Sequence, residues 1–394
     1  MGTMFSGKAV VDWQNSSGLK KGAHDPMLFF YTAAGSHADP KAPFTQCLAY
    51  SQDGGQTIQK YEHNPIIPHI AASTRDPAVI WDPDSEKWIM ALYIGHDEAH
   101  GQSPHQYSLF CSTNLIKWAH LQDLFFPGMG ECPEFFPIPL DGDTNHLKWI
   151  FWTADGHYFV GQFDGHKFTP KTELLKSTYS AVANDQSTGP NFIGGYAAQT
   201  WSDIPAKDGR RLLIAWLTGD IPDMPFNQQM TFPVELTLRT TESGPRLYSW
   251  PINEIKLLVQ EQRILENINL SNSPTLLPTD GHDCLDILAE IDVNRGSDCE
   301  LNLRGISLIY SPIKQELSCL NRNIPLNAVD GKITLRVLLD SASIEIFGAD
   351  GLIYLPISIV PDSDNTTCTV RAVDGVGVVK RCQIAKLCKF HKIT

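Results

Sequence analysis

Hydrophobic residues along the chain occur in short runs that are rich in β-branched and aromatic side chains. Clear examples cover residues 27–31, 87–93, 148–152 and 212–216, and the segments between such runs contain Gly, Pro, Asn and Asp. Short apolar runs between turn-forming residues are typical of β-strands, whereas the three- and four-residue spacing of amphipathic helices is hard to find. The pattern therefore predicts an all-β protein.

A strand with a polar end recurs along the first two thirds of the chain. It is found near Phe5, Asp76, Glu131 and Tyr196, and each interval contains about four strand-like runs. A recurring four-stranded unit of this size is typical of a propeller blade, although these units are longer than the usual ~40–50 residues. We therefore expect a β-propeller with about four blades and long loops.

The pattern changes after Trp250. Residues 252–266 form the one amphipathic stretch, which predicts a short linking helix. Alternating strands follow, with Asp-Gly turn signals between several of them, and we place them at residues 301–308, 333–339, 343–347, 353–359 and 367–372. This spacing fits a β-sandwich. We predict a propeller domain over residues 1–262 and a sandwich domain over residues 263–394.

Composition narrows the range of partners. The chain has 394 residues, which allows two domains with sizeable cores, and its formal net charge is −13. Such an acidic surface disfavours nucleic acids and anionic membranes but is compatible with neutral sugars. No apolar run reaches the ~18 residues that span a bilayer, and residues 1–5 have no signal-peptide pattern. The nine cysteines lack the paired spacing of a zinc site, so we expect neither a metal nor a cofactor.

Two of the recurring strand ends carry carboxylates, which suggests sugar chemistry. Glycoside hydrolysis usually needs one carboxyl group that protonates the leaving oxygen and a second that attacks the anomeric carbon. Glu131 is followed by apolar residues, which favour the protonated acid, and Arg75 is expected to hold Asp76 ionised. Phe5 and Ser6 offer an aromatic wall and a hydroxyl group. Taken singly, these features also fit a loop glutamate, an Asp-Pro turn and ordinary strand packing.

The motifs become specific through their order along the chain. In sequence they are Phe5-Ser6-Gly7, Arg75-Asp76-Pro77, Glu131-Cys132-Pro133, residues 158–165, residues 196–200, residues 230–236 and residues 339–347. Together they resemble glycoside hydrolase family 32, the β-fructofuranosidase, inulinase and levanase family. The resemblance covers the chain from Met4 to about Leu387.

The resemblance implies a five-bladed β-propeller joined to a C-terminal β-sandwich, and hydrolysis of β-fructosyl bonds with retention. It also implies a fructose-containing oligo- or polysaccharide as the partner, and an extracellular or periplasmic location. Glu131 is implied to be the acid/base and Asp76 the transition-state stabiliser. The residues implied to line the fructose pocket or to tune Glu131 are Phe5, Ser6, Arg75 and Cys132.

The sequence departs from the family at the nucleophile. In the family, this aspartate lies in a Trp-Met-Asn-Asp-Pro-Asn-Gly segment that precedes the Phe-Ser-Gly strand. Only four residues precede Phe5, and the segment occurs nowhere in the 394 residues. Partial look-alikes at residues 24–26 and 184–186 lack its flanking residues. We therefore expect the first blade to be largely missing, the nucleophile to be absent and the chain to be inactive alone.

Three interpretations remain. The first is a family hydrolase represented by an N-terminally incomplete chain, and the second is a fructoside-binding protein without catalysis. The third, a β-rich interaction module without a sugar site, leaves the co-occurrence of the motifs unexplained. We favour the first, because the strands near Phe5 and Trp216 are normally apolar and the acid/base is retained. The choice among sucrose, inulin and levan, exo or endo attack, and the oligomeric state stay open.

Overall fold

The computed structural model of the protein is almost entirely β-structure, as the sequence predicts. It describes residues 3–35, 40–71, 73–95, 106–179, 194–219, 221, 227–320, 322–361 and 364–388. Within these residues the chain forms strands β1 to β30, with short 3₁₀ helices such as η3 (Asn253–Leu258) and η4 (Ala349–Gly351). The chain divides into two compact units.

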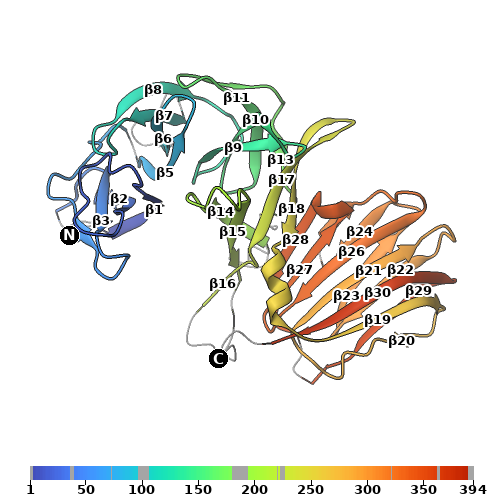
Figure 1. Ribbon diagram of the computed structural model, residues 1–394. Coiled ribbons are helices and arrows are strands. Elements are labelled where there is room, and N and C mark those ends of the chain that lie inside the picture. Colours follow the sequence, from blue (N-terminus) through green and yellow to red (C-terminus); the bar gives the residue numbers. More distant parts are fainter. Residues whose placement is uncertain are drawn as a thin grey trace. The chain divides into compact units, whose positions relative to one another are not determined.

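The first unit contains three successive groups of antiparallel strands in chain order. The first two groups, β1–β4 and β5–β8, are four-stranded sheets, and the third, β9–β12, is part of a ten-stranded sheet. Their first strands, β1 (Thr3–Val11), β5 (Arg75–Asp82) and β9 (Glu134–Leu140), lie next to one another on the inner side of this unit (Figure 1). The remaining strands are β2 (Met27–Ala34), β3 (Thr45–Ser51), β4 (Gln59–Lys60), β6 (Lys87–Tyr93), β7 (Tyr107–Ser112), β8 (Ala119–Leu124), β10 (Asp143–Trp152), β11 (His157–Phe163) and β12 (Phe168–Pro170). Strand β13 (Leu175–Lys176) also pairs with β11.

A fourth group of strands follows in the chain. Its order is β14 (Gly194–Thr200), β15 (Arg211–Thr218), β17 (Val234–Thr241) and β18 (Gly244–Pro251), with β16 (Gln229–Met230) paired to β15. The described residues thus contain four successive groups of about four strands. This matches the four units that the recurring polar strand ends predict.

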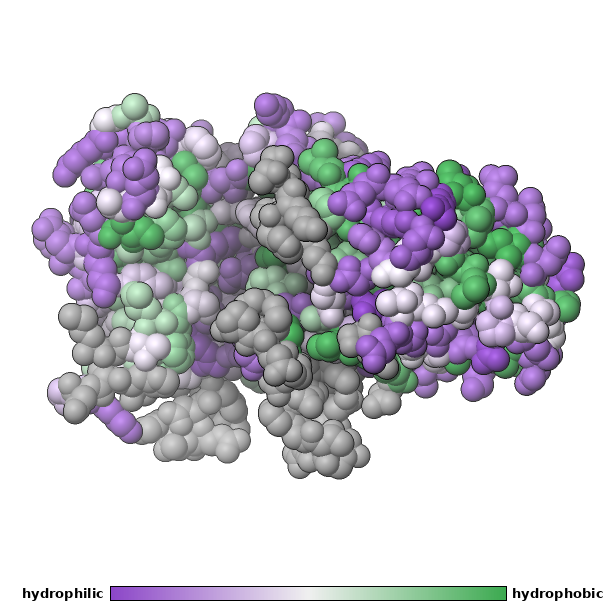
Figure 2. Space-filling model, turned by 90° about the horizontal axis from the view of Figure 1, so that it is seen from below, coloured by the Kyte–Doolittle hydropathy of each residue, from purple (hydrophilic) through white to green (hydrophobic). Residues whose placement is uncertain are grey.

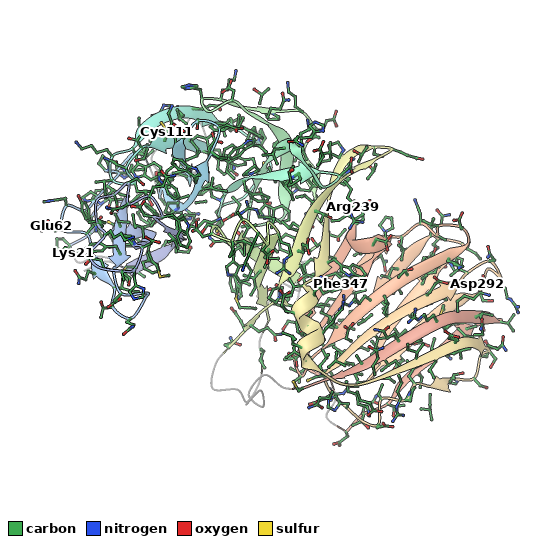
Figure 3. The ribbon with its side chains drawn as sticks, in the orientation of Figure 1. Lys21, Glu62, Cys111, Arg239, Asp292 and Phe347 are labelled. Atoms are coloured by element: carbon green, nitrogen blue, oxygen red, sulfur yellow. The ribbon has the colours of Figure 1, made fainter. Side chains whose placement is uncertain are left out.

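The C-terminal part contains two six-stranded sheets. The first has the order β19 (Val259–Leu270), β30 (Gly377–Leu387), β21 (Leu285–Asp292), β26 (Lys332–Leu339), β27 (Ser343–Gly348) and β28 (Ile353–Ser358). The second has the order β20 (Thr275–Leu276), β29 (Cys368–Val373), β22 (Asp298–Leu303), β23 (Ile306–Ser311), β24 (Glu316–Cys319) and β25 (Arg322–Pro325). Alternate residues such as Leu285, Ile287 and Ala289 face one core between them, as expected for half-buried strands. Figure 3 shows Phe347 and Asp292 at opposite ends of this sandwich.

Two details of the predicted C-terminal strands are wrong. The helix expected over residues 252–266 is only the 3₁₀ turn η3, because pairing with β30 draws the chain into β19 from Val259 onward. The strand expected over residues 301–308 is the hairpin β22–β23, because Arg304 (φ 53°) and Gly305 (φ 88°) form a tight turn. The domain boundary near residue 262 stays a prediction.

The surface of the sandwich mixes hydrophilic residues with scattered hydrophobic ones (Figure 2). Isolated exposed apolar side chains, such as Ile313 and Val329, are normal on protein surfaces. No helix among the described residues is long and apolar enough to cross a membrane.

One carboxyl group is fully buried in the sandwich. Glu345 on β27 has no exposed surface, and it accepts hydrogen bonds from the Phe232 backbone N–H (2.7 Å) and the Tyr354 hydroxyl (2.7 Å). Burial raises the pKa of Glu345 to about 8. The folded protein therefore keeps this carboxyl group protonated at neutral pH.

We expect Glu345 to make the protein less stable as the pH rises. An unfolded glutamate has a pKa of about 4.3, so between that value and about pH 8 the folded state binds the additional proton. The free energy of unfolding should therefore fall through this window, by several kcal/mol at ~1.4 kcal/mol per pH unit. Urea unfolding at pH 5, 7 and 9 measures the slope. Glu345→Gln should flatten it, whereas the exposed Glu290→Gln should not, and equal slopes in all three proteins would contradict the assignment.

Candidate active site

The polar strand ends of the first unit lie at irregular points of the backbone. The register of β1 shifts between Phe5 and Gly7, and that of β5 shifts between Arg75 and Ala78, so an extra residue bulges from each strand. Asp76 has φ 61°, in the left-handed region that non-glycine residues rarely adopt. Bulges and rare backbone conformations re-aim side chains and cluster at functional sites.

Glu131 lies on the loop before β9, and three backbone contacts hold this loop. The carbonyl oxygens of Met129 and Gly130 accept hydrogen bonds from the Gln106 side chain (2.6 Å) and the Tyr107 hydroxyl (2.5 Å). The Glu131 carbonyl oxygen accepts one from the Ala154 N–H (2.9 Å). The loop therefore presents the Glu131 side chain from a fixed backbone.

Arg75 brings Glu131 to the end of β5. Its Nη2 and Nε lie 2.6 and 2.9 Å from Glu131 Oε2. The guanidinium group also donates to the Ser73 carbonyl and hydroxyl oxygens and lies 4.6 Å from the centre of the Tyr93 ring. These contacts fix the plane of the guanidinium group, which presents fixed donor directions to an oxygen-rich ligand.

Asp76 is almost completely buried beside this ion pair. Its Oδ1 accepts a hydrogen bond from Ser6 Oγ (3.3 Å), and its Oδ2 accepts from the N–H (3.3 Å) and Sγ (3.5 Å) of Cys132. Burial raises the pKa of the Asp76 carboxyl, although the positive charge of Arg75 pulls that pKa down. The hydrogen-bond donors that contact Asp76 are therefore mostly uncharged.

The structure adds detail to two expectations about these carboxylates. Arg75 pairs chiefly with Glu131, and its Nε lies 3.5 Å from Asp76 Oδ2, because the bulge turns Asp76 inward. The Glu131 side chain is 31% exposed, and its carboxylate is bound by the guanidinium group. The apolar residues that follow Glu131 enter strand β9, where Phe135 and Phe136 pack in the core instead.

All six residues predicted for the site fall in this one region. Ser6, Arg75, Asp76, Glu131 and Cys132 are linked by the contacts above. Phe5 lies next to Ser6 on β1 and packs edge-to-face against Phe44, with ring centroids 5.8 Å apart. Of the look-alike segments, Asp25 forms an ion pair with Lys20 (2.6 Å), and residues 184–186 lie outside the described residues.

The structure adds residues that the sequence reasoning missed. Tyr93 lies opposite Arg75 in the β5–β6 register. Aligning the two strands of this hairpin in the sequence would have predicted that Tyr93 lies beside Arg75. Asp155 Oδ2 lies 2.8 Å from His157 Nδ1, and a side chain at Gly130 would come within 3.4 Å of Asp155.

A buried ion pair lies further along the same inner strands. Lys8 Nζ on β1 is 2.6 Å from Glu134 Oε2 on β9, and Thr200 Oγ1 donates to the same carboxylate (2.9 Å). Both charged side chains are at least nine-tenths buried. Burial lowers the pKa of Lys8 despite the nearby Glu134, so the pair carries a desolvation cost. The pair joins β1 to β9.

Both parts of the chain match domains of one known protein family. Residues 1–251 match the domain described as Glycosyl hydrolases family 32 N-terminal domain, and residues 254–386 match Glycosyl hydrolases family 32 C terminal. The chain belongs to glycosyl hydrolase family 32. The family resemblance of the ordered motifs is thereby confirmed.

The relatives of this family 32 chain include fructan-degrading enzymes. It is 30% identical to a levanase of Bacillus subtilis (strain 168), and the alignment covers 100% of this chain and 61% of the levanase. It is 26% identical to an extracellular exo-inulinase of Aspergillus awamori, with 97% of this chain and 80% of that protein covered. The chain thus spans about three fifths of the levanase.

Solved structures show the same fold. The exo-inulinase from Aspergillus awamori has a TM-score of 0.79 at 23% identity, and the alignment covers 98% of this chain and 84% of that chain. A β-fructofuranosidase from Schwanniomyces occidentalis, complexed with fructosyl-erythritol, has a TM-score of 0.80 at 21% identity, covering 98% and 83%. The predicted propeller with a C-terminal β-sandwich is therefore confirmed as the fold of the family 32 chain.

Proposed function

We propose that this family 32 chain recognises β-fructosyl units of fructans or sucrose through the cluster around Arg75. The observation that supports this is the convergence of three inner strand ends, which brings Ser6, Asp76 and Glu131 together around one guanidinium group. A sugar ring presents several hydroxyl groups that both donate and accept hydrogen bonds. Adjacent carboxylates, a hydroxyl and a guanidinium group offer the complementary partners.

The roles proposed for hydrolysis follow from the positions of the two carboxylates. Glu131 is the more exposed, so we assign it the acid/base role at the leaving oxygen. Asp76 is buried and accepts three hydrogen bonds, which suits it to gripping fructosyl hydroxyls as the transition state forms. Phe5 and Ser6 form the wall of the pocket on the side of β1. Cys132 holds the orientation of Asp76 and of the Glu131 loop.

We propose that the nucleophile of retaining hydrolysis is not among these 394 residues. The Trp-Met-Asn-Asp-Pro-Asn-Gly segment of the family is absent from the sequence. Asp76 is the carboxylate nearest to the Arg75–Glu131 pair among the described groups, and its oxygens are already engaged. The alternative is a protein that binds fructosides without cleaving them, which the same cluster supports.

Binding of a fructo-oligosaccharide should depend on Arg75. Removing its side chain takes away the donors and leaves the neighbouring Glu131 and Asp76 carboxylates without its positive charge. We expect Arg75→Ala to weaken binding by at least ~10-fold, in line with 1.5–3 kcal/mol for a hydrogen bond to a charged group. Isothermal titration calorimetry with 1-kestose measures the change.

A control is the Arg210–Asp208 ion pair, which lies at the surface and has a similar Nε–Oδ1 distance (2.6 Å). Arg210→Ala should leave the affinity unchanged. An Arg75→Ala protein that binds 1-kestose as tightly as the parent chain would contradict the proposed site.

A further inference from the structure

A cavity lies in the first unit, toward the opposite ends of the inner strands from the candidate active site. Its volume is about 530 Å³, which is enough for a small sugar. Val10 of β1 and Ile80 of β5 line it, and each comes four residues after the site residues Ser6 and Asp76. At ~3.3 Å per residue along a strand, the cavity lies ~13 Å from the Arg75 cluster. The buried Lys8–Glu134 pair lies between them along these strands, so the cavity is separate from the candidate active site.

The apolar part of the cavity wall is rich in tryptophan. Trp13, Trp81 and Trp88 line it, and the last two rings pack edge-to-face with centroids 5.2 Å apart. The Trp13 side chain is 61% exposed, and its Nε1 donates to Asp203 Oδ1 (3.2 Å). This bond orients an accessible indole face. Flat aromatic faces of this kind pack against the C–H faces of a ring.

The polar part of the wall contains a carboxylate and an under-used guanidinium group. Asp203 accepts from the Val11 N–H (2.8 Å) and from Trp13. Arg211 donates from Nη1 to the Trp201 carbonyl oxygen (3.1 Å) and packs 5.0 Å from the centre of the Phe136 ring. Its Nε and Nη2 make no hydrogen bond to any residue that the structure describes. Burial lowers the pKa of Arg211.

These groups discriminate between classes of ligand. A purely apolar ligand would displace water from the Arg211 donors and leave them unpaired, which is costly for a charged group. An anion would pair with Arg211 but would also face the Asp203 carboxylate. A neutral sugar ring satisfies all three features, because hydroxyl groups accept from Arg211, donate to Asp203 and leave a C–H face for Trp13.

We propose that this cavity is a second sugar site, which holds a fructosyl unit of the same polysaccharide away from the reacting bond. The identity of the sugar rests on the proposed function, whereas the preference for a neutral ring rests on the cavity itself. A second site for one polymer raises the effective concentration of its ends at the first site. The gain should therefore appear with long fructans and not with sucrose.

The test measures binding in the chain whose first site is silenced by Arg75→Ala. Isothermal titration calorimetry with 1-kestose should detect one remaining site, and adding Trp13→Ala should weaken it at least 10-fold. Trp13→Phe retains a flat ring but loses the bond to Asp203, so it should bind within about threefold of the Arg75→Ala chain. Trp216→Ala, which removes another partly exposed tryptophan outside the cavity, should have no effect.

Each alternative occupant has its own probe. Inorganic phosphate should neither bind nor compete, and competition by phosphate would overturn the proposal in favour of an anion site. Cellotriose that binds as tightly as 1-kestose would overturn the fructosyl assignment. Equal 1-kestose affinity with and without Trp13→Ala would overturn the second site while leaving the Arg75 site intact. Conversely, a chain in which only Trp13→Ala affects binding would contradict the proposed function and retain the second site.

Discussion

The 394-residue chain is expected to release no measurable fructose from sucrose, inulin or levan when it is assayed alone. Retaining hydrolysis requires a carboxylate that attacks the anomeric carbon, ~5–5.5 Å from the acid/base. Asp76 is a poor substitute, because it is 5% exposed and its oxygens accept hydrogen bonds from Ser6 and Cys132. Losing a catalytic group of this kind costs on the order of 10⁴-fold or more in turnover.

A reducing-sugar assay compares this chain with one that is extended at its N-terminus by a blade carrying the Asn-Asp-Pro segment. We expect the extension to restore turnover. An extended chain in which that aspartate is replaced by asparagine controls for folding, and should be as inactive as the 394-residue chain. Rapid fructose release by the 394 residues alone would show that one of their own carboxylates is the nucleophile.

The fold was largely readable from the sequence because its signals are local. Short apolar runs between turn residues marked β2, β6 and β15, and Asp330-Gly331 and Asp350-Gly351 marked tight turns with positive φ. The sequence pattern gave the wrong element over residues 252–266, where we expected a helix. The exposed residues of β19 resemble a helix face in the sequence, and only pairing with β30 makes them a strand.

The sequence picked out the residues of the proposed site, which the structure brings close together, but it did not predict how they pair. Arg75 and Asp76 are adjacent in the chain, which suggests an ion pair, yet the bulge in β5 directs the guanidinium to Glu131. Register shifts of this kind depend on tertiary packing and leave no local signal. The same holds for the bond between Lys8 and Glu134, which joins residues 126 positions apart.

The backbone at Asp76 links the fold to the proposed chemistry. A left-handed conformation costs about 1–3 kcal/mol at a non-glycine residue and persists only where the surroundings enforce it. Here the Asp76 N–H donates to Thr32 Oγ1 (3.2 Å), and Cys132 donates to its side chain. Strands of the neighbouring β1–β4 sheet and the Glu131 loop therefore hold this carboxylate in place before any ligand arrives.

Replacing Glu131 by glutamine is expected to reduce turnover of sucrose or inulin ~10²- to 10⁴-fold in a chain that carries the nucleophile. This is the usual contribution of a positioned general acid. Glutamine keeps the size of the side chain and can still accept a hydrogen bond from Arg75 Nη2, so 1-kestose binding should persist within a few fold. The loss should therefore appear in kcat. Glu173→Gln, an exposed glutamate in the same unit, should leave the rate unchanged.

The leaving group separates an acid from a merely structural residue. The acidic phenol of an aryl fructoside leaves without protonation. The Glu131→Gln variant should therefore lose much less activity on this substrate than on sucrose. Asp76→Asn should not show this selectivity, because Asp76 contacts the fructosyl part that both substrates share in the proposed site. Equal losses of Glu131→Gln on both substrates would remove Glu131 from the acid role. Its carboxylate would then serve to position Arg75, because it accepts the two shortest hydrogen bonds that Arg75 donates to a carboxylate.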